Sequence, residues 1–237
     1  MIWPVLPLAS LLAWWKLPWT LTLLFIQRIR GASRQSKTGD KDLRKWMARK
    51  ILSIAGWQID PTNPHHARCV LIAAPHTSNW DFPMMILFTS AFDLKVKWMG
   101  KDSLFVGPLG YFFKSLGGIP IVRSKSTNLV NQMIELFAKS DRLMLVVPAE
   151  GTRSRTENWK SGFYHIAHGA DVPVLPTFLD YGKKRGGFGI PIRLTGNIMA
   201  DMDIIRTFYA PYCGKYPELS GPVQLSEEAH GNALKLD

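Results

Sequence analysis

One short segment of the chain holds a histidine and an aspartate that could work together as a base and its partner. The segment His76–Asp81 reads HTSNWD and follows an apolar run, residues 69–74, that is typical of a buried strand. The aspartate can hold the imidazole in one tautomer, and the imidazole can then take a proton from a hydroxyl. A histidine beside an aspartate in a loop often forms only a structural hydrogen bond, so the pair needs support from other residues.

A second segment, EGTRSR, places a carboxylate, a glycine and arginines on one predicted strand-to-loop turn. It begins with Glu150, Gly151, Thr152 and Arg153. The guanidinium of Arg153 can bind a phosphate through two parallel hydrogen bonds, and Gly151 permits close approach to the backbone. Glu150 would fit such a site by pairing with an arginine or by accepting a hydroxyl of the same ligand. A structural salt bridge at a turn is the alternative.

A third candidate, Arg123, emerges from the predicted strand Ile119–Val122. A lone arginine there is usually a solvated strand end. In open α/β sheets, however, ligands bind at the carboxyl ends of strands, and His76, Arg123 and Glu150 each lie just past one. We therefore expect these three side chains to share one crevice.

Several kinds of chemistry have no signature in this chain. No metal-ligand spacing, P-loop, dinucleotide fingerprint or G-x-S-x-G nucleophile elbow occurs, so we expect neither a metal nor a cofactor. Nothing marks an activated serine or cysteine, which favours direct transfer over a covalent intermediate. Cys69 and Cys213 form no metal-type cluster, and a reduced domain facing the cytoplasm is the simplest interpretation.

The elements that must position these residues alternate between strand and helix patterns. This alternation predicts an α/β fold, a mostly parallel sheet covered by helices. A basic glycine loop, residues 182–187, is expected between the last two strands, and the tail after Lys215 is polar and predicted to pack poorly. The predicted strands are 70–74, 96–99, 119–122, 143–147, 174–179 and 190–194, and the predicted helices are 82–92 (with Ser78 and Asp81 in cap-like positions), 106–116, 129–137 and 163–170.

Four segments resemble, in order and spacing, the four blocks of the glycerophosphate and lysophosphatidic acid acyltransferase family. They are HTSNWD, GIPIVR (residues 118–123), EGTRS, and VPVLP (residues 172–176), and the resemblance covers about residues 69–180. It implies that His76 is the general base, that Asp81 is its partner, and that Arg123, Glu150, Gly151, Thr152 and Arg153 bind the acceptor. It also implies an acyl-CoA or acyl-carrier-protein donor and a lysophospholipid acceptor.

The chain departs from the family pattern beside the third block. Ala149 stands where the family usually has proline, and Pro148 lies one place earlier. The segment 159–164 (WKSGFY) looks like a subfamily embellishment. These departures leave the histidine and aspartate intact and bear on which acceptor is used.

Charge and hydropathy indicate a membrane partner. The chain has 237 residues and a net charge of +11, and nine of its basic residues lie in residues 28–50 against Asp40 and Asp42, which leaves +7 there. The preceding segment, residues 1–27, contains one charged side chain, Lys16, and four of the nine tryptophans. This order fits an interfacial aromatic belt followed by a cytoplasmic basic block at an anionic membrane surface. Nucleic acid could attract the same charge, but lipid is the simpler explanation.

The apolar segment could span the bilayer or dip into one leaflet. It is long enough for a span of about 20 residues, but Lys16 near its middle costs roughly 2.5–3.5 kcal/mol and prolines interrupt it. No positive charge precedes it, which argues against a cleaved signal peptide. Within residues 43–54 one face follows helical spacing, which predicts a basic amphipathic helix on the core, at the membrane or both. Its residues are Leu43, Trp46, Met47, Lys50, Ile51 and Ile54, of which only Lys50 is not apolar.

These observations divide the chain into four parts. They are a membrane-embedded segment (1–27), a basic linker, placed at 31–40, with an amphipathic helix (28–56), an acyltransferase domain (57–213) and a polar tail (214–237). The expected function is transfer of a fatty acyl group to 1-acyl-glycerol-3-phosphate at the cytoplasmic side of the cell membrane. The alternatives are the same chemistry on a lyso-aminolipid or glycerol phosphate, and a non-catalytic phospholipid-binding protein of the same fold.

Overall fold

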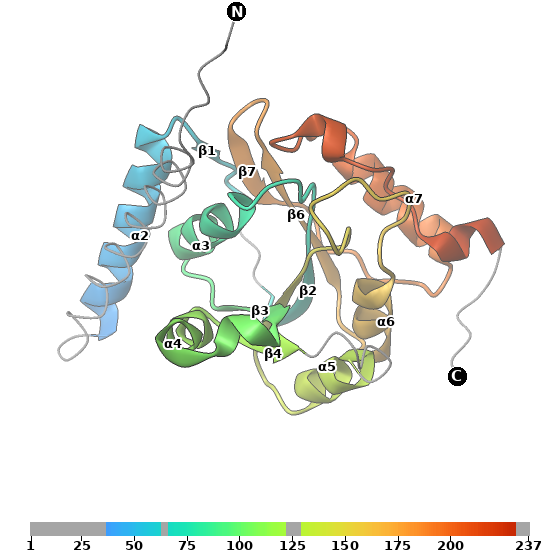
Figure 1. Cartoon of the computed structure of the whole chain (residues 1–237), viewed down its shortest axis with the longest axis horizontal. Helices are drawn as coiled ribbons and strands as arrows, with labels where there is room; N and C mark the ends of the chain where they lie inside the picture. The colour runs from blue at the N-terminus through green and yellow to red at the C-terminus, as the bar shows by residue number, and fades with distance from the viewer. Residues whose placement is uncertain (1–36, 63–65, 122–128, 231–237) are drawn as a thin grey trace, which may run out of the picture.

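A seven-stranded sheet with helices on both faces forms the frame of the protein (Figure 1). The computed structural model describes residues 37–62, 66–121 and 129–230. The strand order across the sheet is β1-β7-β6-β2-β5-β3-β4. The strands are β1 (Gln58–Ile59), β2 (Arg68–Ala73), β3 (Val96–Lys101), β4 (Gly118–Ile121), β5 (Leu143–Val147), β6 (Val174–Asp180) and β7 (Arg185–Phe188).

Five neighbouring strands run parallel, and this determines where loops meet. Strand β2 pairs in parallel with β5 on one side and with β6 on the other. Ile72 lies opposite Val147 of β5 and Pro176 of β6, so the carboxyl ends of the three strands lie side by side. Strand β7 is antiparallel to β6 and parallel to β1. The last residue of β1 therefore lies at the amino ends of the five parallel strands.

The central strands read as continuous apolar runs because helices cover both of their faces. Alternate residues belong to two separate cores: Val70 and Ile72 pack towards α5, α6 and α7, whereas Cys69 and Leu71 pack towards α2 and α3 (Figure 1). The helices are α2 (Lys37–Ile54), α3 (Asp81–Ala91), α4 (Gly107–Ser115), α5 (Leu129–Ala138), α6 (Gly162–Gly169) and α7 (Ile198–Tyr209), with 3₁₀ turns η1 (Asp102–Phe105), η3 (Pro217–Leu219) and η4 (Ser226–His230).

The predicted mostly parallel sheet with flanking helices is confirmed, but its last part was predicted wrongly. Residues 190–194 form only an isolated bridge between Ile192 and Val174. The basic glycine segment predicted as a loop instead contains β7, which pairs with β6 across a tight turn. Glycine at position 186 lets strand β7 approach helix α3 closely, since a Cβ there would meet the ring of Phe88 at 2.5 Å.

Residues 196–228 pack on the domain, and those of them after Lys215 do so contrary to the prediction of a poorly packed tail. Helix α7, which the sequence pattern did not indicate, buries Met202 and Ile205 in the core beside α6. Leu225 is 1% exposed, and the backbone N–H of Trp159 donates to the carbonyl of Gln224. The segment 159–164 also belongs to this core, with Trp159, Phe163 and Tyr164 buried.

Helix α2 presents its predicted apolar face to the outside. It begins at Lys37, inside the region predicted as a linker, and packs on α3 through the buried side chains of Ala48 and Leu52. Trp46 and Ile54 are 58% and 85% exposed. The helix is therefore held through Ala48 and Leu52, and Trp46 and Ile54 are left exposed.

The membrane-embedded segment predicted over residues 1–27 lies outside the described residues. Within the described part of the chain, no helix is both long and apolar enough to cross a bilayer. The four-part division of the chain stays a prediction.

Candidate active site

The predicted pair of His76 and Asp81 is formed. The Nδ1 atom of His76 lies 3.0 Å from Oδ2 of Asp81, and the two side chains are 18% and 7% exposed. The carboxylate directs the Nδ1 proton towards itself, which leaves Nε2 as the basic nitrogen. Because β2 ends at Ala73, the pair stands at the carboxyl edge of the sheet, where a substrate hydroxyl can reach it.

Asp81 is the first residue of α3 and does not cap it, contrary to the predicted cap-like role. The residue before the helix is Trp80, which makes no side-chain capping bond. The two carboxylate oxygens of Asp81 are used otherwise: Oδ2 also accepts from the N–H of Ser78 at 3.0 Å, and Oδ1 accepts from the hydroxyl of Tyr181 at 2.8 Å. Three donors thus hold a carboxylate that is almost fully buried.

Glu150 supports the histidine loop from the neighbouring strand. It follows β5, is 4% exposed, and its Oε2 accepts from the backbone N–H of His76 at 2.9 Å. Burial raises the pKa of Glu150 above its ordinary value, against the lowering effect of the bond from His76. This bond is none of the roles expected for Glu150 from the sequence, and it indicates that Glu150 positions the loop that carries His76.

The turn after Glu150 is exposed beside the pair. Gly151 has a φ of +69°, a backbone conformation that favours glycine, and a Cβ there would meet the side chain of Lys160 at 2.8 Å. Thr152 accepts from the N–H of Ser154 at 3.2 Å. Arg153 is exposed and makes no ion pair within the described residues, so its guanidinium is available to an anionic ligand.

Arg123 lies outside the described residues. Strand β4 ends two residues before it, at the same edge of the sheet as the histidine, but β5 and β3 stand between β4 and β2. Its expected role in the crevice therefore stays a prediction. The position of Ala149 is clear: the side chain is fully buried, so the departure from the family pattern lies in the core.

The sequence interpretation missed the residues that close the other side of the site. Tyr181 follows β6 directly, so the rule that selected His76 and Glu150 could also have selected it. No local signal indicated the segment 213–216. There the N–H of Tyr216 donates to Thr77, and the ammonium of Lys215 lies 5.2 Å from the ring centre of Trp80.

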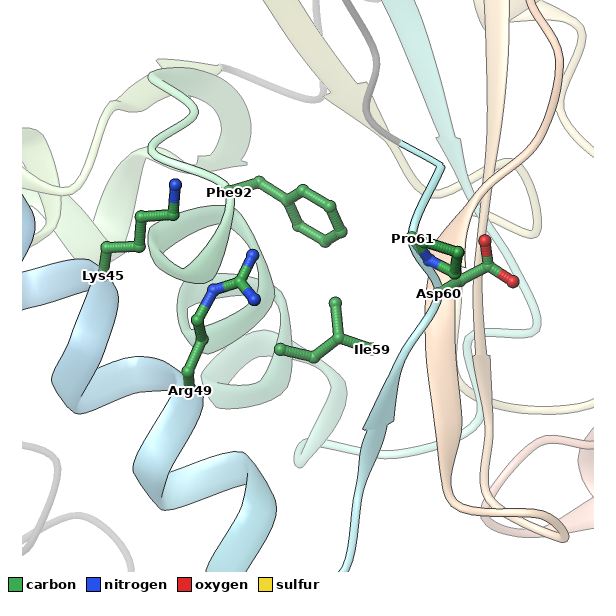
Figure 2. Close-up of a pocket in the computed structure, with 6 residues that line it drawn as sticks. All are labelled: Lys45, Arg49, Ile59, Asp60, Pro61 and Phe92. Atoms are coloured by element: carbon green, nitrogen blue, oxygen red, sulfur yellow. The ribbon is translucent and has the colours of Figure 1, made fainter.

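A pocket of about 270 Å³ lies away from the pair (Figure 2). In Figure 2, Lys45 and Arg49 reach from α2 towards Phe92 and Ile59. The end of β1 and the end of α3 border it, and both lie at the amino edge of the parallel strands. This pocket therefore does not serve the His76–Asp81 pair. In the described part of the chain, no group of three or more His, Cys, Asp or Glu is placed to hold a metal ion.

The fold and the site together define a class: an α/β protein with a histidine paired to a buried aspartate at the carboxyl ends of its parallel strands. The family model described as Acyltransferase matches residues 58–180, which is more than half of the chain. The chain belongs to this family, as the sequence resemblance implied, and is an acyltransferase enzyme. A comparison with curated protein sequences found no match.

The fold is also similar to that of a solved acyltransferase. It is described as the crystal structure of the 1-acyl-sn-glycerophosphate (LPA) acyltransferase PlsC from Thermotoga maritima. The TM-score is 0.53 with 15% sequence identity, over 90% of this chain and 89% of that one. At this identity the similarity concerns the arrangement of the elements.

Proposed function

We propose that this acyltransferase moves a fatty acyl group from acyl-CoA or acyl-carrier protein to the hydroxyl of 1-acyl-glycerol-3-phosphate, which gives phosphatidic acid. The observation that carries the proposal is the 3.0 Å contact between His76 Nδ1 and Asp81 Oδ2 at the open edge of the sheet. The T. maritima protein of similar fold is described as acting on the same acceptor, which supports this choice.

The chemistry is a direct transfer. Nε2 of His76 takes the proton of the acceptor hydroxyl as its oxygen attacks the thioester carbonyl, a carbon–oxygen bond forms, and the carbon–sulfur bond breaks. The departing sulfur leaves as a thiol after receiving the proton from the imidazolium. A base placed in this way contributes typically about 10²–10⁴-fold to the rate. Asp81 keeps the imidazole in the required tautomer throughout.

We place the acceptor phosphate at the turn that carries Arg153. The guanidinium is exposed, lies three residues after Glu150, which bonds to the backbone of His76, and has no ion-pair partner within the described residues. A planar guanidinium can bind a phosphate monoester with two parallel hydrogen bonds. A lyso-aminolipid or glycerol phosphate presents related groups, so the acceptor must be identified by assay.

We further propose that the enzyme works at the cytoplasmic side of the cell membrane. The outward apolar face of α2 supports this, because it would lie in the interface while the basic residues of the same helix attract anionic lipid. Each such basic side chain near the surface contributes about 1 kcal/mol. An enzyme placed there meets an acceptor and a product that are both lipids.

The activity is tested with purified enzyme, a labelled acyl thioester and a panel of lyso-lipids with glycerol 3-phosphate, with products identified by mass spectrometry. We expect phosphatidic acid from 1-acyl-glycerol-3-phosphate. His76→Ala should reduce turnover by about 10²–10⁴-fold, and Asp81→Asn should lose most activity. His66→Ala is the control, because His66 precedes β2 and so lies at the amino ends of the parallel strands, away from the pair. Near-normal turnover of His76→Ala would refute the proposed mechanism.

The acceptor site is tested by a pair of neighbouring arginines. Arg153→Ala should raise the acceptor KM and leave the thioester KM unchanged, and Arg153→Lys should restore binding only in part. Arg155→Ala is the matched control, because that guanidinium already donates to the carbonyl of Ser220 at 2.9 Å. An equal rise in both KM values for Arg153→Ala would indicate a structural role.

A further inference from the structure

The two carboxylate oxygens of Asp81 have different partners, and Tyr181 binds one of them. Its hydroxyl donates to Oδ1 at 2.8 Å, while Oδ2 faces the imidazole of His76 and the N–H of Ser78. Tyr181 directly follows β6, the strand next to β2, and is separated from Asp81 by 100 residues in sequence. The hydroxyl therefore fixes the rotation of the carboxylate from outside the segment that carries the pair.

The ring of Tyr181 is itself held firmly. Its backbone N–H donates to the carbonyl of Cys213 at 2.9 Å, and its ring meets that of Trp57 edge-on, with centres 5.0 Å apart. The ammonium of Lys215 lies 5.6 Å from the ring centre. Contacts from two separate segments, at Trp57 and at residues 213–215, thus aim the hydroxyl at Asp81.

The hydroxyl stays a donor over the whole range in which the enzyme could work. Burial, together with the neighbouring Asp81 carboxylate, raises the pKa of Tyr181 far above its ordinary value. A protonated phenol can satisfy a buried carboxylate oxygen that would otherwise be left unpaired, and such a bond to a charged group contributes more than one between neutral groups.

We propose that Tyr181 is a positioning residue for acyl transfer: its hydroxyl orients Asp81 and withdraws charge from the carboxylate that faces His76. The inference rests on the roles of His76 and Asp81 in the proposed function. Tyr181 does not contact the reacting atoms itself. It acts on the base through the aspartate.

The charged groups around the pair give the sign of the effect. The carboxylates of Asp81 and Glu150 lie against His76, one at its Nδ1 atom and the other at its backbone N–H. The ammonium of Lys215 and the phenol of Tyr216, a residue that is 43% exposed, lie close to Tyr181. Removing the Tyr181 hydroxyl leaves more negative charge on Asp81. The imidazole should then hold its proton more tightly and become active as a base only at higher pH.

The variant Tyr181→Phe removes the hydroxyl and keeps the ring. We expect kcat to fall about 10- to 100-fold, the range for a lost hydrogen bond to a charged group, with both KM values within about twofold because no substrate contact is lost. The pH at which kcat/KM reaches half of its plateau should rise. Tyr212→Phe is the matched control, since that ring stacks on Phe178 at 3.9 Å and makes no hydrogen bond to Asp81.

A second variant disturbs the fold less and tests the direction of the pH shift. Site-specific 3-fluorotyrosine at position 181 has nearly the same size and a more acidic hydroxyl, so it donates more strongly. It should move the half-plateau pH below that of the native enzyme, opposite to Tyr181→Phe. A purely structural role would not produce shifts in opposite directions.

The outcomes separate this inference from the proposed function. If His76→Ala is inactive while both Tyr181 variants keep the native kcat and pH profile, the positioning role is overturned and the proposed base stands. If His76→Ala remains active, the proposed base fails and the role of Tyr181 fails with it. Opposite pH shifts of the two variants, with an inactive His76→Ala, would support both.

Discussion

At the scale of single residues, the site consists of one pair of side chains and the groups that hold it. His76 and Asp81 come from one short segment, but Glu150 and Tyr181 reach them from the two neighbouring strands. Neither of these two groups needs to touch a substrate to matter. The orientation of the imidazole depends on its own backbone N–H, which Glu150 holds, and on the carboxylate that Tyr181 holds.

The buried carboxyl of Glu150 should leave a signature in the dependence of stability on pH. Burial raises its pKa in the folded protein above its ordinary value of 4.5. The folded state therefore binds this proton more tightly, so the stability that the group contributes is present below about pH 4.5 and is lost as the pH rises through the raised pKa.

The variant Glu150→Gln removes this titration and keeps an oxygen that can accept from His76. We expect the Tm of the variant minus the Tm of the native protein to become more positive as the pH rises from 4 to 8. Thermal unfolding followed by circular dichroism measures it. Asp60 and Glu227, whose pKa values are lowered in the folded protein, lose stability towards low pH in both proteins and cancel in the difference. A difference that does not change with pH would contradict the raised pKa.

At the scale of elements, α2 combines two roles on opposite faces. Ala48 and Leu52 attach it to the domain, and Trp57 just beyond its end packs against Tyr181, whose hydroxyl donates to Asp81. On its other face, the side chains of Trp46 and Ile54 are exposed. Helix α2 therefore fixes the distance between its exposed apolar face and the His76–Asp81 site.

The outer face of α2 should contribute to membrane binding in a chain shortened to residues 28–237. The double variant Trp46→Ser, Ile54→Ser should bind anionic liposomes at least roughly tenfold more weakly, because burial of each large side chain is worth roughly 1.5–3 kcal/mol. Sedimentation at low and high salt measures it, and the binding that remains should be salt-sensitive.

The matched control for this prediction lies on α7. Met199 and Ile204 are 55% and 53% exposed there, on the far side of the sheet. The variant Met199→Ser, Ile204→Ser should bind liposomes like the unmodified shortened chain. Equal weakening by both double variants would show that exposed apolar surface in general, and not α2, carries the binding.

At the scale of the whole molecule, the last part of the described chain completes the domain. Helix α7 and the turn η4 close one face of the sheet, where the guanidinium of Arg206 bonds to the carbonyl of Val223 and to the carboxylate of Glu228. A buried bond of 2.5 Å from Tyr164 to Asp201 joins α6 to α7. The family match ends at residue 180, but the packed core does not.

Leu225→Ala should therefore destabilise the protein by about 2–5 kcal/mol, the range for truncation of a buried leucine. Urea unfolding measures it, and Glu218→Ala on the exposed side of the same segment is the control. A poorly packed tail, as the polar composition predicted, would give a loss below about 0.5 kcal/mol.

Local pattern was sufficient for much of this protein. Apolar runs bounded by turn residues predicted β2, β5 and β6, and the rule for strand ends predicted that His76 and Glu150 would lie together. The His76–Asp81 contact could be predicted because both residues belong to one loop and the start of one helix. The family could be predicted because its blocks lie in such loops.

Tertiary structure alone decided the rest. The strand order β6-β2-β5 placed Tyr181 against Asp81, and no spacing along the chain reveals which strands become neighbours. Residues 185–187 of the segment predicted as a loop became part of strand β7 because β6 offered an unpaired side, while residues 182–184 form the turn. In helix α2, Trp46 and Ile54 are exposed because the helix packs on the domain through Ala48 and Leu52. Each of these outcomes depends on contacts between distant segments, and their free energy is absent from any local window of sequence.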